Sequence, residues 1–185
     1  EVGVYDVVSR EPEMDEAARM LEAMSHRGMD SSGVTIAGES VSEGLIVRVW
    51  ADPDGGYQER FDRAEEVLTI MGGVVGSRQS VGEYLRLSVN YEGPVRELAE
   101  ALMGVEGVEI HSIGECSEVV KDIGTGIALD QKHHVSEIRG THGIGHVRMA
   151  TESRVDISHA HPFWAYPFPD VTVVHNGQLT NYHKL

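Results

Sequence analysis

Two positions in the last third of the chain could bind and polarise a small substrate that carries a carboxylate. The first is Arg148, which lies in an otherwise apolar stretch flanked by glycines. A guanidinium is costly to bury without an anionic partner, and its planar fork suits a carboxylate through two parallel hydrogen bonds. Taken alone, however, Arg148 is better explained by a structural ion pair with one of the many acidic residues.

The second position is the pair Asn176-Gly177, which follows the strand-like run 171–175. An Asn-Gly pair usually forms a tight turn, and by itself that is the better interpretation. The residues at 178–182 do not resemble the return strand of a hairpin. The Gly177 N–H and the Asn176 side-chain amide could therefore converge on a developing oxyanion instead.

A metal site is a weaker interpretation of the ten histidines. The pairs His142/His146 and His159/His161 have ligand-like spacing, but the first lies in a glycine-rich stretch that cannot hold one helical face. No carboxylate cluster accompanies them. We therefore expect no metal ion.

The elements that position these residues fall into three stretches. In residues 1–40 we expect a strand from Val2 to Val8, a helix with Asp15 as N-cap, an ordered loop at 25–33 and a strand at 34–37. In residues 116–185 we expect a short helix at 117–123, a connection to 140, and strands near 143–149 and 171–175.

The middle stretch, residues 41–115, alternates strands and helices. Strands are predicted at 44–50, 73–75, 83–91 and 108–113, and helices at 57–71 and from Pro94 onward. The order βαββαβ is the ferredoxin-like split pattern. We interpret this stretch as an inserted subdomain that serves as scaffold or docking surface; the alternative is a small-molecule regulatory module.

Arg148 and Asn176-Gly177 are weak indications of function when taken singly, but they belong to four motifs that occur in a fixed order. They are HRGMDSSG at 26–33, GIGHVRMAT at 143–151, AHPF at 160–163 and VHNGQLTNY at 174–182. Together they resemble the class II, N-terminal-nucleophile type of glutamine amidotransferase. The sequence is most similar to the amidotransferase-like subunits of glutamate synthase and N-methylglutamate synthase systems.

The resemblance implies a role for each site residue. Arg148 would hold the α-carboxylate of glutamine with Thr151 beside it, Asn176 and Gly177 would form the oxyanion hole, and His161 would support the pocket. The implied reaction is attack of an N-terminal cysteine thiolate on the side-chain amide, with its own α-amine as base. Glutamate and ammonia would result, and the ammonia would pass to a flavin-dependent, glutamate-synthase-like subunit. No cofactor is implied within this chain.

The implied fold is an α+β, Ntn-hydrolase-like αββα sandwich, incomplete at its C-terminus. Residues 1–40 and 116–185 would form the N-terminal portion of the amidotransferase type-2 domain around the insertion at 41–115. The family continues well beyond the oxyanion motif, so we expect the missing half on the same or a separate chain.

The sequence departs from the family at its start, because Val2 stands where the nucleophilic cysteine belongs. An altered start, a misread sequence or a natural pseudoenzyme would each explain this. Cys116 is a poor substitute, since it lies in the connection after the insertion and has no free α-amine. As written, the chain is expected not to hydrolyse glutamine; the alternative is a non-catalytic, glutamine-binding or scaffold subunit.

Composition restricts the partners further. The formal net charge is -15, from 30 acidic against 15 basic residues. Such a field disfavours nucleic acid and anionic membrane surfaces, and a dispersed, solvated acidic surface is the simplest interpretation. The single cysteine excludes an intrachain disulfide, and no apolar run is long enough to span a membrane. We therefore expect a cytoplasmic protein.

Overall fold

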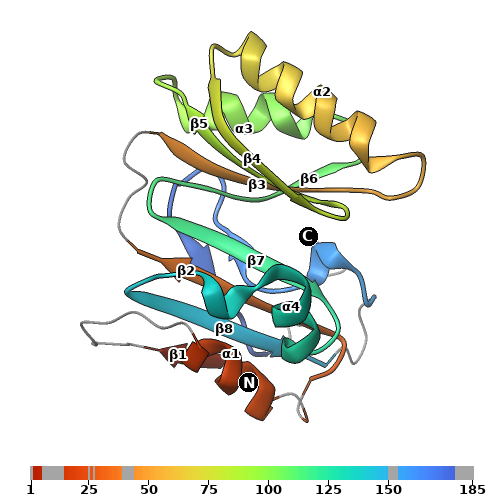
Figure 1. Ribbon diagram of the computed structural model, residues 1–185, viewed down its shortest axis with the longest axis vertical. Helices are drawn as coiled ribbons and strands as arrows, with labels where there is room; N and C mark the ends of the chain where they lie inside the picture. Colours follow the sequence, from red (N-terminus) through yellow and green to blue (C-terminus); the bar gives the residue numbers. More distant parts are fainter. Residues whose placement is uncertain are drawn as a thin grey trace.

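The computed structural model describes residues 2–5, 15–24, 26, 28–38, 44–149 and 154–177. The described chain is mixed α+β, with two four-stranded antiparallel sheets and one pair of short strands (Figure 1). This confirms the predicted α+β class, and the arrangement is compatible with an Ntn-hydrolase-like fold.

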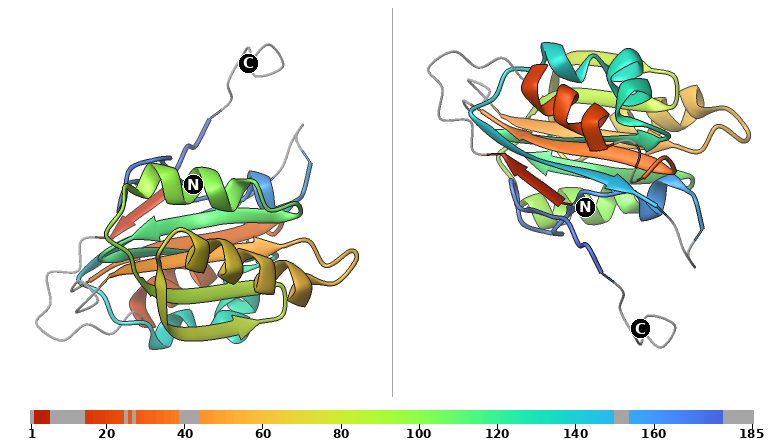
Figure 2. Two further views of the ribbon diagram at one scale, coloured as in Figure 1. Left: turned by 90° about the horizontal axis from the view of Figure 1, so that it is seen from above. Right: turned by 90° about the horizontal axis from the view of Figure 1, so that it is seen from below.

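The first sheet is built from the two ends of the chain. It contains β1 (Val2–Tyr5), β2 (Ser31–Ala37), β7 (Ser117–Ile123) and β8 (His142–Arg148) in the order β1-β8-β2-β7. Helices α1 (Asp15–Met24) and α4 (Gly126–His133) cover one face. The segment 154–173 crosses the opposite face (Figure 2). The helical face is closed by an apolar cluster: Leu21, Val34, Ile36, Val120, Leu129, Val135 and Val147.

The second sheet is formed by the middle of the chain. Its strands are β3 (Leu45–Ala51), β4 (Val74–Val81), β5 (Tyr84–Asn90) and β6 (Val108–Gly114), in the order β4-β5-β3-β6. Helices α2 (Tyr57–Ile70) and α3 (Val95–Met103) cover its outer face (Figure 1). Alternate residues of β3, from Leu45 to Ala51, turn toward these helices and pack in one core with Phe61, Leu68 and Leu98.

Polar side chains join the two sheets along β7. Glu118 accepts hydrogen bonds from Arg48 and Arg86 of the second sheet. The Tyr84 hydroxyl donates to Asp122 over 2.6 Å. Strand β7 is therefore an edge strand of the first sheet, and the second sheet packs against it.

Most predicted elements are found, but several differ. The loop predicted at 25–33 ends earlier, because residues 31–33 belong to β2, where they pair with β7 and β8. Residues 117–123, expected to be a short helix, form strand β7 instead, because the charged residues Glu118, Lys121 and Asp122 are buried there and paired with distant groups. The predicted strand at 73–75 extends to Val81 and forms a hairpin with β5. The predicted strand at 171–175 shortens to β10 (Thr172–Val173), which pairs with β9 (Phe163–Trp164).

Short 3-10 turns lie at Val135–Glu137 and Ile157–His159. None of the described helices is long and apolar enough to cross a membrane. The second half of the predicted first strand, residues 6–8, lies outside the described residues.

Candidate functional site

The loop before β2 fits tightly against the backbone of Arg148. A Cβ on Gly28 would come within 2.7 Å of the Arg148 carbonyl carbon, so only glycine fits there without displacement. The Asp30 N–H donates to the Arg148 carbonyl over 3.1 Å. Ser31, the first residue of β2, is the direct cross-strand partner of Arg148. This loop therefore fixes the end of β8 at which the arginine side chain emerges.

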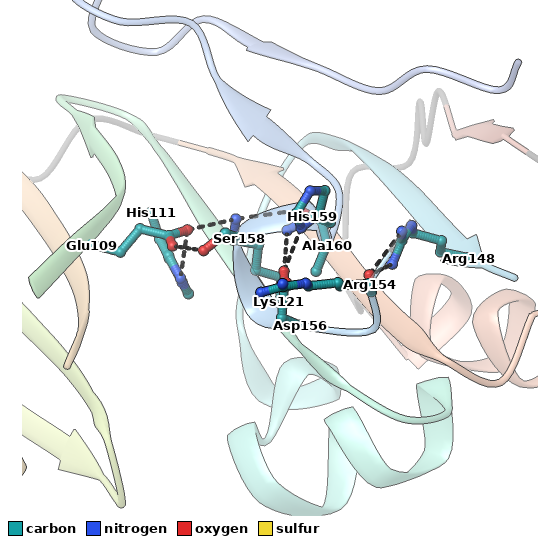
Figure 3. A network of polar contacts seen from close by, with 9 residues as sticks. All are labelled: Glu109, His111, Lys121, Arg148, Arg154, Asp156, Ser158, His159 and Ala160. Atoms are coloured by element: carbon teal, nitrogen blue, oxygen red, sulfur yellow. Dashed lines mark hydrogen bonds and ion pairs between the residues drawn. The ribbon is translucent and has the colours of Figure 1, made fainter. Parts of the chain in front are cut away.

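The Arg148 side chain is buried and turns toward the segment that crosses the sheet. Residue Arg148 is 8% exposed. Its Nη1 and Nη2 atoms donate to the Arg154 carbonyl over 3.2 and 3.1 Å (Figure 3). Two donors of the guanidinium thus converge on one carbonyl oxygen, whereas an arginine binds a carboxylate through two parallel hydrogen bonds to its two oxygens.

A pair of histidines lies beside Arg148. The ring centroids of His146 and His161 are 4.4 Å apart, and the His161 ring lies 4.4 Å from that of Phe163. The Nδ1 atoms of both histidines are buried without a hydrogen-bond partner among the described residues. Burial, and next to it positive charge that includes Arg148, lowers the pKa of His146 to about 4. Burial, followed by the neighbouring His146 and Arg148, lowers the pKa of His161 to about 4 as well. Both rings are therefore neutral at pH 7.

The segment that carries His161 is held by a network on its buried side (Figure 3). The Lys121 ammonium is 3% exposed and donates to the Ala160 carbonyl over 3.2 Å and to Glu109 over 3.3 Å. Ser158 donates to the other oxygen of Glu109 over 2.5 Å. Because these groups are fixed on β6 and β7, the position of His161 is tied to both sheets.

Gly33 provides the closest contact between the sheet and this segment. A Cβ at Gly33 would lie 2.2 Å from the His161 carbonyl oxygen and 2.7 Å from the Lys121 Cβ. No side chain larger than hydrogen fits at this point of β2. The glycines of the 26–33 motif therefore bring Arg148 and His161 together.

The predicted oxyanion residues directly follow a histidine that lies near this cluster. Asn176 and Gly177 are exposed and follow His175. His175 is near enough to affect both buried rings: its backbone raises the pKa of His146, and its charge lowers that of His161. The loop at 175–177 therefore approaches the histidine pair.

Val2 lies at the same place in the first sheet. It is the direct antiparallel partner of His146 in the pairing of β1 with β8. The position that resembles the family's nucleophile thus lies opposite the buried histidine and two residues from Arg148 along the neighbouring strand. Thr151 lies outside the described residues.

Cys116 is not activated as a nucleophile. It lies in the turn between β6 and β7, and burial followed by the nearby carboxylate of Asp170 raises the pKa of its thiol. The Asp170 carboxylate also accepts the backbone N–H of Cys116 over 3.0 Å. A raised pKa disfavours the thiolate, which is the reactive form.

His146 and Phe163 were not predicted as members of this site. The alternation along β8 carried a signal, because His146 and Arg148 are two residues apart and must share a face. Among the described residues, no group of three or more His, Cys, Asp or Glu side chains is placed to hold a metal ion.

Comparison with known proteins points in one direction. No family model matches the chain. It is 33% identical over 172 residues to a protein of Methanothermobacter thermautotrophicus whose provisional name is glutamine amidotransferase, covering 90% of this chain and 56% of the relative. It is 31% identical over 188 residues to the glutamine amidotransferase-like protein GlxB of Rhizobium meliloti, covering 100% of this chain and 60% of the relative. Amidophosphoribosyltransferase of Escherichia coli is 33% identical over 79 residues, which is 43% of this chain and 16% of the relative.

These similarities support a glutamine amidotransferase family. The chain spans little more than half the length of the first two relatives.

Proposed function

We propose that this chain is part of the glutaminase domain of a class II amidotransferase. Arg148 binds the α-carboxylate of glutamine, Thr151 lies beside it, His161 supports the pocket, and Asn176 with Gly177 stabilises the oxyanion. The observation that carries the proposal is the gathering of Arg148 and the His175 loop around the two neutral histidines, beside the strand that holds Val2.

The neutral histidines suit a site for a zwitterionic substrate. With both imidazoles uncharged, Arg148 supplies the positive charge beside the histidine pair, and this charge would select a carboxylate. A carboxylate bound there would exchange water for charge-assisted hydrogen bonds in a buried setting, where these are strongest. The side-chain amide of glutamine would then extend toward β1 and the loop at 175–177.

The chemistry needs a nucleophile that Val2 does not supply. In the proposed reaction a thiolate at position 2 attacks the amide carbon, ammonia leaves, and water releases glutamate from the thioester. We propose that the chain as written is inactive for this reason, and that the ammonia of an active form passes to a flavin-dependent, glutamate-synthase-like partner. We further propose that residues 41–115 form a ferredoxin-like insertion, which the strand order β4-β5-β3-β6 and the two helices on one face support.

The test restores the nucleophile in the full protein that carries this chain. Val2→Cys, made with Glu1 removed so that the cysteine bears the free α-amine, should release glutamate and ammonia from glutamine. Val2→Ala with the same new start is the matched control and should release neither. Glutamine binding is measured on both variants by calorimetry.

The two readouts separate the proposal from its alternative. Turnover by the cysteine variant alone supports the glutaminase. Binding of glutamine by both variants without turnover favours a non-catalytic glutamine-binding or scaffold subunit. Absence of glutamine binding in both variants contradicts the proposed site.

A further inference from the structure

A polar cavity, whose lining does not include Arg148, lies between the second sheet and the end of α4. Its volume is about 70 Å³, and its lining includes Arg48, Gln79, Val81, Tyr84, Arg86 and His133. Among the residues that the structure describes, no carboxylate lines it, although acidic residues outnumber basic ones two to one in the chain. Its charged lining is therefore basic against the trend of the whole chain.

The two arginines of the cavity share a single carboxylate. Arg48 and Arg86 are direct cross-strand partners on β3 and β5, an arrangement in which like charges repel. Arg48 donates through Nε to Glu118 over 2.5 Å, and Arg86 donates through Nε and Nη2 over 2.8 and 3.2 Å. One negative charge thus faces two positive charges.

Several donors of these arginines are not used by the protein. Nη1 and Nη2 of Arg48 and Nη1 of Arg86 have no acceptor among the described residues. Both side chains are mostly buried, with 14% and 20% of their surface exposed. Guanidinium donors at a cavity wall are a specific recognition element for oxyanions.

The neighbouring acidic groups are already occupied and do not line the cavity. Asp122 accepts from the Tyr84 hydroxyl over 2.6 Å, and it lies 3.0 Å from His133 Nε2 and 2.8 Å from the Lys132 ammonium. Lys132 also pairs with Glu83 over 2.9 Å. These contacts hold Tyr84 and His133 in place as walls, and they pair both Asp122 and Glu83 with cations or donors.

The volume limits the size of the occupant. A buried water needs about 10–15 Å³ of such space. The cavity therefore takes a few waters or one small oxyanion group. We propose that it binds a small oxyanion, the carboxylate or phosphate group of a metabolite, through the unused guanidinium nitrogens of Arg48 and Arg86. The cavity is lined by residues of β3, β4, β5 and α4 and not by Arg148, so such a ligand would bind apart from the proposed glutamine site.

Binding is tested on the full protein by calorimetry with two probes, inorganic phosphate and acetate, each at ionic strength matched with sodium chloride. Saturable binding of at least one probe is expected. Binding of phosphate alone indicates a phosphate group as the natural ligand, and binding of acetate alone indicates a carboxylate. Arg86→Gln should weaken that binding about tenfold or more, as loss of a charge-assisted contact does. Arg78→Gln is the matched control, because Arg78 pairs with Glu65 outside the cavity and is expected to have no effect.

A second variant keeps the test decisive if Arg86→Gln does not fold. Val81→Phe changes an exposed position of β4 that lines the cavity, and it fills the space while both arginines remain. It should abolish binding of the probe. Absence of saturable binding to the unmodified protein, or equal effects of Arg86→Gln and Arg78→Gln, would overturn the proposal.

Discussion

The imidazole rings of His146 and His161 lie 4.4 Å apart at an interplanar angle of 31°, and one belongs to a strand while the other belongs to the segment that crosses it. Neither Nδ1 has a partner among the described residues. Two buried, neutral and incompletely hydrogen-bonded rings cost stability, so we expect them to have a functional role.

The histidine pair should make the protein sensitive to mild acid. The folded pKa of about 4 lies below the unfolded value of about 6.5, so the unfolded chain binds protons that the native protein does not. The free energy of unfolding should therefore be fully retained above about pH 6.5. It should fall on the order of 1–3 kcal/mol per histidine as the pH drops toward about 4.

Denaturant unfolding of His146→Gln between pH 7 and pH 4.5 checks this, and a shallower loss of stability is expected. His134→Gln removes an exposed imidazole and serves as control. A native-state pKa near 6.5 for both buried rings, measured by NMR, would contradict the burial argument.

Replacing Arg148 should remove glutamine binding from any form of the protein that binds it. Arg148→Ala deletes the guanidinium, including both donors that now converge on the Arg154 carbonyl. Arg148→Lys keeps the charge but loses the fork, so affinity should fall by about tenfold or more in both variants. Calorimetry with glutamine checks this, with Arg78→Ala as a surface control. Unchanged affinity in Arg148→Ala would refute the role assigned to this residue.

Gly33→Ala should be severely destabilising. The added Cβ would meet a backbone oxygen at 2.2 Å, and the neighbouring Lys121 is itself buried and tied down. A loss of about 1–3 kcal/mol or more of unfolding free energy is expected, as for overpacking of a core. Gly104→Ala is the comparison, because its Cβ, just after α3, would lie 3.2 Å from the Ala101 carbonyl oxygen and 3.9 Å from that of Glu100. Equal unfolding midpoints for the two variants would show that the backbone of β2 can shift at Gly33 to accommodate the added methyl group, contrary to the prediction.

Glu118→Gln should loosen the junction of the two sheets. Burial alone would raise the pKa of Glu118, but Arg48 and Arg86 outweigh it and hold the pKa below the usual range. The carboxylate therefore contributes stability above its ordinary pKa, and this contribution is lost as the pH falls through the folded value. Removing it at pH 7 leaves two buried cations unpaired, at a cost of about 3–5 kcal/mol.

Thermal and denaturant unfolding at pH 7 measure this cost. Glu65→Gln, which breaks the exposed pair with Arg78, is the control and should change stability by less than about 1 kcal/mol. Similar losses in the two variants would mean that Glu118 does not couple the sheets.

The sequence was most informative where apolar periodicity and glycine placement act locally. The helices of the middle segment, α2 and α3, and most strands were predicted near their observed positions, because their buried residues recur at the period of the element. The strand at 117–123 was missed for a physical reason. Glu118, Lys121 and Asp122 find their partners on β3, β5, β6 and α4, and no local pattern encodes partners so distant in sequence.

The candidate site was predictable in its motifs but not in its packing. Arg148 was identified from its apolar surroundings, and its burial is confirmed. The roles of Asn176, Gly177, Val2, Thr151 and His161 stay predictions. The stacking of His146 on His161 could not be foreseen, because it depends on a close approach between β2 and a segment more than a hundred residues later.

The departure and return of the middle segment have a practical consequence. The Gly38 N–H donates to the Cys116 carbonyl over 2.9 Å, so the chain leaves the first sheet and re-enters it at neighbouring points. A short linker between these two residues could therefore close the gap with little loop-closure cost. Such an excision would also remove Arg48 and Arg86, the cations that pair with Glu118. A version of the protein trimmed to its first sheet should therefore carry the neutral substitution Glu118→Gln as well.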